Sequence, residues 1–400
     1  MTELRPFPFA QGPNVCPSPE HEEIRAAGEP MRVRLGDGRT ALIVADFEDV
    51  RTVLSDPRFS REAAATGNPF FARTRQSLAL SGSDAPDHTR RRKAIAHAFG
   101  AGRIADFVPE LERIASELID AMTAGGKEAD LVASFTIPFT MRPMCLLIGI
   151  PEDDCALLKP WVDAMMSISR FGPEQVAEAH KRVNDYFVAL VAAKREALDA
   201  GTPDADLLTD LLRTSGTEQG LSTDEIEVMG AGLLMAGYET ISNHLAGSVY
   251  LLLQHPSLVA RIRRDEAELP LVIEELLRHI SLAGTGGHKH QAVADVPLSN
   301  TVVRTGELVV PLTEAANHDP AVFDRADEFR PERSPNPHIA FGFGRHFCPG
   351  AALARAELRV ALGRLVTRLP GLELTVPTER VAWREDMYIG GPWALPVRWS

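Results

Sequence analysis

The segment Phe341-Gly342-Phe343-Gly344-Arg345-His346-Phe347-Cys348-Pro349-Gly350 decides how the rest of the chain is interpreted. Residues 351–358, which follow at once, consist of strong helix formers such as alanine, leucine and arginine. Because proline is favoured at the first position of a helix, we expect this helix to begin at Pro349. Cys348 would then lie at a helix N-terminus, where free N–H groups and the helix dipole stabilise a thiolate. A thiolate held in this way can serve as an axial ligand of haem iron.

These ten residues resemble the cysteine-loop signature of cytochrome P-450 enzymes, F-G-x-G-x-H-x-C-x-G, at every fixed position. The resemblance implies that Cys348 ligates the iron of haem b and that Phe341, His346 and Gly350 bind the cofactor. Two other interpretations of Cys348 are a small buried hydrophobic residue and half of a zinc site shared with His346. The sequence offers no second Cys/His pair at zinc-finger spacing, so we expect haem.

Composition excludes several classes of protein. The chain has 400 residues, of which 44% are hydrophobic and 24% charged, as in an ordinary globular enzyme. Its formal net charge of -13 argues against non-specific binding to nucleic acid, which needs a basic face. The 4 cysteines are scattered, which suits a reducing cytoplasm rather than a disulfide framework. The first residues include no apolar run of signal-peptide or anchor length, so we expect no membrane association.

A second motif lies in the middle of an apolar helix expected at about 223–254. Gly237 and the adjacent pair Glu239-Thr240 are unusual there, because glycine weakens a helix and a buried carboxylate needs partners. With Ala236 they resemble the family's oxygen-activation motif, A-G-x-(D/E)-T. The resemblance implies that Gly237 leaves room for dioxygen, that Thr240 holds the bound oxygen and a water, and that Glu239 relays protons. Ile241 stands where many relatives have a second threonine, which should alter the water chain slightly.

Further positions are expected to bind the haem propionates. His88 and Arg92 are four residues apart on a helix expected from Asp87 to about Phe99, so they share a face. The resemblance implies that both clamp a propionate. His290 stands where relatives carry an arginine ligand of a propionate; it could still donate, with a charge that depends on pH near its reference pKa of about 6.5. The arginines expected to dock an acidic redox partner, or simply to form a solvated face, are Arg90, Arg91, Arg345, Arg355 and Arg359.

Three charged residues are expected to form a buried structural cluster. Glu275 and Arg278 are three apart on a helix and can pair, although an E-x-x-R pattern alone is usually a surface salt bridge. In the family this pair meets an arginine from a later segment, here Arg333 of Phe329-Arg330-Pro331-Glu332-Arg333. The resemblance therefore implies that Glu275, Arg278 and Arg333 support the cysteine loop.

The resemblance extends over essentially the whole chain. It implies one mainly α domain, residues 1–400, with a small β-rich lobe, and haem between the Thr240 helix and the helix after Cys348. Residues 1–30 and 58–86 are expected to be irregular. Gly36-Asp37-Gly38 predicts a hairpin, and helices are expected near 102–125, 134–149, 151–170, 173–200 and 204–214. The candidate substrate-pocket residues are Leu233, Leu234, Leu282, Ala283, Met387 and Tyr388.

The implied activity is mono-oxygenation of a hydrophobic small molecule, in secondary metabolism. The co-substrate is O2, and electrons come from NAD(P)H through a separate ferredoxin and ferredoxin reductase in the cytoplasm. Oxidative C–C or C–N coupling of aromatic substrates, such as cyclic dipeptides or other peptides, uses the same haem and stays open. So does a non-catalytic haem or ligand-binding protein, although that would not need Glu239-Thr240. A peroxygenase usually lacks this acid–alcohol pair.

Overall fold

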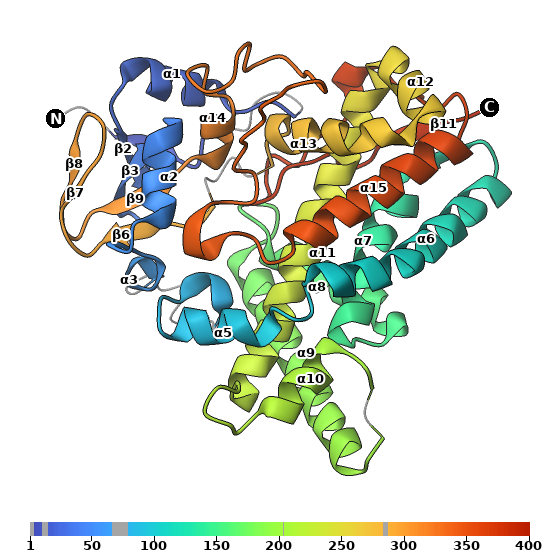
Figure 1. Ribbon diagram of the computed structural model, residues 1–400, viewed down its shortest axis with the longest axis horizontal. Helices are drawn as coiled ribbons and strands as arrows, with labels where there is room; N and C mark the ends of the chain where they lie inside the picture. The colour runs from blue at the N-terminus through green and yellow to red at the C-terminus, as the bar shows by residue number, and fades with distance from the viewer. Residues whose placement is uncertain (1–3, 10–14, 66–78, 203, 283–286) are drawn as a thin grey trace. The chain divides into compact units, whose positions relative to one another are not determined.

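The computed structural model describes residues 4–9, 15–65, 79–202, 204–282 and 287–400. These residues group into two compact units. Figure 1 colours the chain by residue number, from blue at the N-terminus to red at the C-terminus. The first, called here the sheet unit, comprises Met1–Ser77, Ser81–Asp84 and Leu271–Cys348. The second, called the helical unit, comprises Leu78–Leu80, Ala85–Pro270 and Pro349–Ser400.

The sheet unit is built on a mixed sheet in the order β1-β2-β3-β9-β6-β4. Its strands are Arg5–Phe7 (β1), Met31–Leu35 (β2), Thr40–Val44 (β3), Phe59–Ser60 (β4), His290–Ala292 (β6) and Leu308–Pro311 (β9). β2 and β3 pair antiparallel across the predicted hairpin, and β3 pairs with β9 in parallel. A small ribbon pairs Val296–Pro297 (β7) with Val302–Val303 (β8).

The sheet unit also contains short helices. They are Pro19–Ala27 (α1), Phe47–Ser55 (α2), Arg61–Ala65 (α3), Leu269–His279 (α13) and Thr313–Asn317 (α14), with single turns at Leu80–Gly82 (η2) and Gly344–His346 (η6). The prediction of an irregular segment at 1–30 is wrong, because it contains β1 and α1. Pro19 begins α1, and Gly28 ends it in the left-handed conformation at φ 68. The sequence therefore contains both a helix start signal and a helix stop signal in this segment. The loop predicted at 58–86 likewise contains β4, α3 and η2.

The helical unit contains the long helices. They are Asp87–Ile95 (α5), Ala101–Ala124 (α6), Ile137–Ile148 (α7), Cys155–Met165 (α8), Pro173–Asp199 (α9), Leu207–Thr214 (α10), Thr223–Leu253 (α11), Pro256–Arg264 (α12) and Ala351–Arg368 (α15). A π-helical turn, Val132–Thr136 (η3), precedes α7. Short turns lie at Glu152–Asp154 (η4), Glu266–Glu268 (η5) and Thr378–Arg380 (η7). Glu128–Asp130 (β5), Glu373–Leu374 (β10) and Pro396–Arg398 (β11) form a small sheet in the order β10-β11-β5.

α11 is the central element of the helical unit, in contact with α7, α9 and α15, and α15 runs beside α6 (Figure 1). A reciprocal capping box starts α11: the Ser222 hydroxyl accepts from the Glu225 N–H, and the Glu225 carboxylate accepts from the Ser222 N–H. The predicted helix at 151–170 is too long at both ends, because α8 spans Cys155–Met165. Beyond its end, Ser167 forms a β-bridge with Met387.

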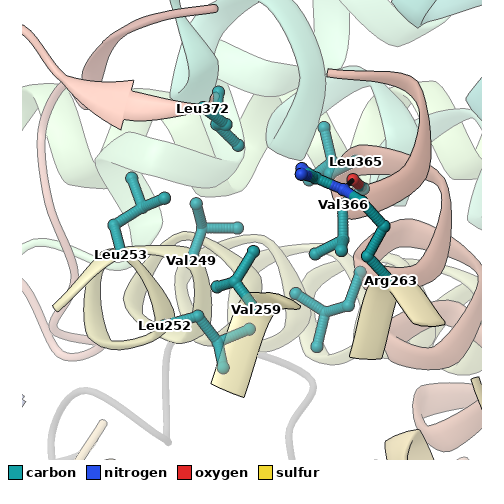
Figure 2. A pocket seen from close by; sticks show the side chains of 9 residues that line it. Val249, Leu252, Leu253, Val259, Arg263, Leu365, Val366 and Leu372 are labelled. Atoms are coloured by element: carbon teal, nitrogen blue, oxygen red, sulfur yellow. Dashed lines mark hydrogen bonds between the residues drawn. The ribbon is translucent and has the colours of Figure 1, made fainter. Parts of the chain in front are cut away.

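Figure 2 shows a small apolar pocket near the C-terminal end of α11. Its side chains are Val249, Leu252, Leu253, Val259, Arg263, Leu362, Leu365, Val366 and Leu372. Val249 lies nine residues after Thr240, about 14 Å along the helix. The pocket is therefore a packing defect of the core and not part of the predicted oxygen site. Among the described residues, the helices include none with the length and apolarity that crossing a membrane requires.

Candidate functional site

The cysteine loop is held in a fixed shape by its own backbone. The Cys348 N–H donates to the Phe341 carbonyl at 2.9 Å, and the Phe347 N–H donates to the Gly344 carbonyl at 3.1 Å. Gly342 and Gly344 have φ of 73 and 71, which only glycine adopts readily. The side chain of Cys348 itself is partly exposed. The loop therefore presents its sulfur from a rigid frame.

This loop is also fastened to α2. A Cβ at Gly344 would lie 2.7 Å from the Leu54 carbonyl oxygen, so only glycine permits this close approach. Arg345 donates through Nη2 to the Asp56 carbonyl at 3.0 Å. The guanidinium of Arg51 lies 4.5 Å from the centre of the Phe343 ring. Arg345 thus binds backbone within the sheet unit, and its role in docking a redox partner stays a prediction.

The helix after Cys348 starts later than predicted. α15 begins at Ala351 with Gly350 as its N-cap, and the Gly350 carbonyl accepts from the Ala354 N–H at 2.9 Å. Pro349 precedes the cap instead of occupying the first helical position. The prediction was wrong by two residues because proline favours the turn before a helix as well as its first position.

Glu275, Arg278 and Arg333 come together in the sheet unit. Arg278 donates to both Glu275 oxygens at 2.8 Å, and neither side chain has any exposed surface. Arg333 adds an ion pair with Glu275 at 3.1 Å. The second positive charge is compensated by backbone carbonyls of Asn317, Asp324, Arg325, Ala326 and Glu328. The cluster joins α13 to the segment that leads into the cysteine loop.

The middle of α11 carries the predicted oxygen-side residues on an accessible face. Ala236 is exposed, and Gly237 and Thr240 are partly exposed, whereas Tyr238 and Glu239 between them are buried. The Thr240 hydroxyl donates to the Ala236 carbonyl at 2.6 Å. Its proton is therefore engaged, and its oxygen remains able to accept a hydrogen bond.

Gly237 has a packing role that the sequence did not show. A Cβ at this position would lie 2.5 Å from the Met144 sulfur of α7. The glycine thus permits the close contact of α11 with α7. Its place beside dioxygen stays a prediction.

Glu239 is locked by two partners that sequence reasoning missed. Its carboxylate lies 2.7 Å from Nη2 of Arg384, and its side chain has no exposed surface. Asn243 bridges the two, because it accepts from Arg384 Nη1 at 3.1 Å and donates to the Glu239 carbonyl at 2.7 Å. Burial raises the pKa of Glu239 and outweighs the opposing effect of Arg384. Arg384 lies in the C-terminal segment after η7, where the sequence has no pattern that would single it out.

Charged groups of α8 lie near Glu239. The Tyr238 hydroxyl donates to Asp163 at 3.1 Å, and Asp163 is paired with Lys159 at 2.5 Å. Asp163 raises and Lys159 lowers the pKa of Glu239. The Lys159 side chain is 34% exposed, so its ion pair with Asp163 reaches solvent.

On α5, His88 is buried and Arg92 is partly exposed, four residues apart as predicted. The arginines between them have another function. Arg90 and Arg91 form ion pairs with Glu225 of α11 at 2.6 Å and 2.9 Å. Both arginines join α5 to the start of α11. Arg91, at 3% exposure, is too buried to dock a partner, whereas the docking role of Arg90, at 28% exposure, stays a prediction.

His290 is hydrogen-bonded to an arginine of the sheet unit. It is buried in β6, and its Nε2 accepts a hydrogen bond from Nε of Arg61 at 3.1 Å. Burial, reinforced by the positive charge of Arg61, lowers the pKa of His290 well below its ordinary value. The lowered pKa favours the neutral imidazole, and a contact of His290 with a propionate stays a prediction. His346 lies in the same region, with Nε2 4.0 Å from the Asp84 carboxylate.

Two of the predicted pocket residues belong to the core. Leu234 and Met387 have no exposed surface, so neither lines an open space. Leu234 lies on the side of α11 opposite Ala236, and the neighbour of Met387, Tyr388, donates its N–H to the Met166 carbonyl at 2.8 Å. The other candidates are Leu233 at 9% exposure, Tyr388 at 40% and Leu282, which is partly exposed. Ala283 lies outside the described residues.

Comparison with known proteins gives the family. The sequence model of cytochrome P-450 matches residues 156–370, which is more than half of the chain. The chain belongs to the cytochrome P-450 family. Nocardicin C N-oxygenase of Nocardia uniformis subsp. tsuyamanensis is 37% identical to this P-450 over 100% of this chain and 99% of its own length. Mycinamicin IV hydroxylase/epoxidase of Micromonospora griseorubida is 36% identical over 99% of each chain.

Among solved structures, this P-450 is similar to the LnmA cytochrome P-450 hydroxylase from the leinamycin biosynthetic pathway of Streptomyces atroolivaceus. The TM-score is 0.89 and the identity 36%, over 99% of this chain and 100% of that one. The mainly α fold with small sheets is therefore that of the family, as predicted. The protein is a monooxygenase that uses haem iron and dioxygen.

The described side chains fit the haem that the family implies. A partly exposed cysteine stands on a rigid loop, as a thiolate ligand requires. Small residues are exposed in the middle of α11. Among the described residues, the side chain of Arg61 has no carboxylate within ion-pair distance, which suits the carboxylates of the cofactor.

Proposed function

We propose that this P-450 inserts one oxygen atom from O2 into a hydrophobic small molecule of secondary metabolism. The observation that carries this proposal is the pair Glu239-Thr240, an enclosed acid beside a partly exposed alcohol, in a chain that also presents Cys348. A non-catalytic haem protein would not need this pair. The relatives named nocardicin C N-oxygenase and mycinamicin IV hydroxylase/epoxidase support oxygen insertion over coupling.

Each site residue has a proposed role. Cys348 is the iron ligand, supported by Phe341 and Gly350, and His88, Arg92 and His346 bind propionates. When bound, the haem supplies the iron centre at which dioxygen is activated. Thr240 already donates its proton to Ala236, so it can accept a hydrogen bond from a water or from protonated oxygen. It thereby holds the proton donor beside the accessible face of α11.

Glu239 is the proposed proton source. Its raised pKa makes the neutral, proton-donating form more accessible than that of an ordinary glutamate. Arg384 holds the carboxylate at 2.7 Å in the observed arrangement. A change of the Glu239 rotamer away from Arg384 would release it for proton transfer, and the region of Asp163 and Lys159 would resupply the proton from solvent.

Electrons would come from NAD(P)H through a ferredoxin and its reductase, in the cytoplasm. Among the arginines considered for docking, Arg359 is exposed on α15. It is the proposed contact for an acidic ferredoxin.

The test is turnover with a surrogate ferredoxin and reductase under labelled dioxygen. Substrates are first selected from a natural-product library by the low-spin to high-spin shift of the haem absorption. One labelled oxygen atom in the product is the expected result. Coupled product without label would replace the proposal by oxidative coupling, and binding without turnover would replace it by a ligand-binding role. The Cys348→Ala variant should lose the strongly red-shifted absorption of the reduced carbon monoxide complex.

A further inference from the structure

Arg61, the first residue of α3, has the features of an anion-binding residue. Its Nε donates to His290 Nε2 at 3.1 Å and its Nη1 to the Ser81 carbonyl at 3.4 Å. Both acceptors are neutral. Among the described residues, no ion pair is formed by its guanidinium, although the side chain is partly exposed. Burial lowers the pKa of Arg61 to about 10, so the protein alone compensates its charge poorly.

Asp84, the nearest carboxylate, is committed to other donors. It accepts from the Ser60 hydroxyl at 2.5 Å and from the Glu62 N–H at 3.3 Å, and its other oxygen accepts from the Arg61 backbone N–H at 3.4 Å. These bonds fix the first turn of α3. Asp84 therefore holds the backbone of Arg61 in place and leaves its guanidinium available.

The hydrogen bond between Arg61 and His290 defines the state of the imidazole. A guanidinium only donates, so Nε2 of His290 must be the acceptor and the proton of the neutral ring lies on Nδ1. Nδ1 is buried and has no hydrogen-bond partner among the described residues. Neither ring nitrogen of His290 is thus free to reach an external anion. The imidazole instead fixes the direction of the guanidinium.

The surroundings leave this guanidinium in need of one anion. The other groups that act on it or on His290 are Arg345, His288, His346 and Asp84. Arg345 is bound to backbone carbonyls. Asp84 acts on Arg61 only through its charge and not through a side-chain ion pair, because its oxygens accept from Ser60 and from the N–H groups of Arg61 and Glu62.

We propose that Arg61 supplies the guanidinium that binds a haem propionate in this P-450, and that His290 is the positioning residue that orients it. The inference rests on the proposed function in that the chain binds haem through Cys348. A histidine at position 290 is too short and too enclosed to replace the arginine of the relatives. Arg61, on the neighbouring helix α3, supplies the positive charge that His290 lacks. The residues of α3 pack against β6, which contains His290.

The first test measures how fast haem leaves the ferric holoprotein for an excess of apomyoglobin. Arg61→Gln should lose haem roughly tenfold faster or more, because a charge-assisted hydrogen bond to a carboxylate is removed. The rate of haem loss from Arg61→Lys should lie between those of the native protein and Arg61→Gln. The matched control is Arg58→Gln, since Arg58 lies three residues earlier and pairs with Asp56 at 2.6 Å on the surface. An unchanged rate in Arg61→Gln would overturn the proposal.

The second test separates positioning from direct contact. His290→Leu should also release haem faster, but should add nothing in an Arg61→Gln background. His290→Gln should stay close to the native rate, because its amide oxygen can accept from Arg61. Effects of His290→Leu and Arg61→Gln that multiply would show that His290 touches the haem itself.

Absorption of the reduced carbon monoxide complex keeps the two proposals distinct. A native protein without the thiolate band overturns the proposed function and this inference together. A native protein with that band, whose Arg61→Gln variant retains haem equally well, overturns only the role of Arg61. Far-ultraviolet circular dichroism of each apoprotein verifies that the variants fold.

Discussion

At the scale of single residues, the chemistry depends on how strongly Glu239 is held. The carboxylate has one cation, Arg384, and one amide, Asn243, and no exposed surface. A proton source that is fixed this way donates only when the ion pair opens. If Glu239 is the proton source, as proposed, the strength of the pair sets how often protons arrive at the reacting oxygen.

Arg384→Gln should uncouple the enzyme. Without the guanidinium the pKa of Glu239 rises further, since Arg384 is the main group that lowers it, and the carboxyl loses its fixed orientation. We expect a smaller yield of oxygenated product per NAD(P)H and more hydrogen peroxide, with partial recovery in Arg384→Lys. The exposed neighbour Arg380→Gln is the control. Native coupling in Arg384→Gln would contradict this role.

Pro349 should affect the iron through what it lacks. A proline next to Cys348 has no N–H, so one possible N–H···S donor to the thiolate is missing. Pro349→Leu should therefore make the reduction potential of the haem more positive, as measured by redox titration without substrate. The exposed Ala352→Leu serves as the control for added bulk. Equal potentials in native protein and Pro349→Leu would refute this effect.

At the scale of elements, one carboxylate joins α5 to α11. Glu225 caps its own helix and accepts from Arg90 and Arg91 of α5. Burial alone would raise the pKa of Glu225, but these hydrogen bonds outweigh it and lower the pKa to about 2. The joint fixes the helix that carries His88 and Arg92 to the helix that carries Thr240.

Glu225→Gln should destabilise the protein by roughly 3 kcal/mol at pH 7, because it leaves Arg91 without its buried partner. A lowered pKa contributes stability above the ordinary value of about 4.5, and this is lost as pH falls towards about 2. The difference between native protein and variant should therefore shrink between these two pH values. Urea unfolding at pH 7 and pH 3 measures it, with the exposed Glu218→Gln as control. A difference that is independent of pH would show that the charge is not the cause.

The elements also show which parts of the structure a sequence can predict. α11 and the β2–β3 hairpin were found because their signals, the Ser222–Glu225 capping box and Gly36-Asp37-Gly38, are local. The Glu275 cluster was found because its spacing is part of a family signature. Arg61 and Arg384 were missed because each acts on a residue more than a hundred positions away, and no local pattern marks such contacts. Leu234 was assigned to the wrong side of α11 for the same reason.

At the scale of the whole molecule, folding depends on the cluster around Glu275. One carboxylate without exposed surface neutralises Arg278 and Arg333 and joins α13 to the chain that leads to Cys348. The net free energy of unfolding of a protein is about 5–15 kcal/mol, so loss of one charge from such a cluster removes a large fraction of the stability.

Glu275→Ala should abolish production of folded haem protein. Removing this carboxylate leaves two buried guanidinium groups uncompensated, which costs roughly 3–5 kcal/mol or more. The yield of soluble protein with the thiolate carbon monoxide band measures the effect. Glu332→Gln, an exposed acid one residue from Arg333, is the control and should give the native yield. A normal yield from Glu275→Ala would show that the backbone carbonyl groups alone can compensate the charges of Arg278 and Arg333.

The contact of Gly237 with Met144 has a consequence for sequence change. A single methyl group added at 237 would lie 2.5 Å from the sulfur and 2.6 Å from the terminal carbon of Met144. Alanine can therefore replace this glycine only if the methionine turns aside or a shorter residue replaces it. Homologues or designed variants with alanine at 237 should carry a smaller side chain at 144, and the two positions should change together.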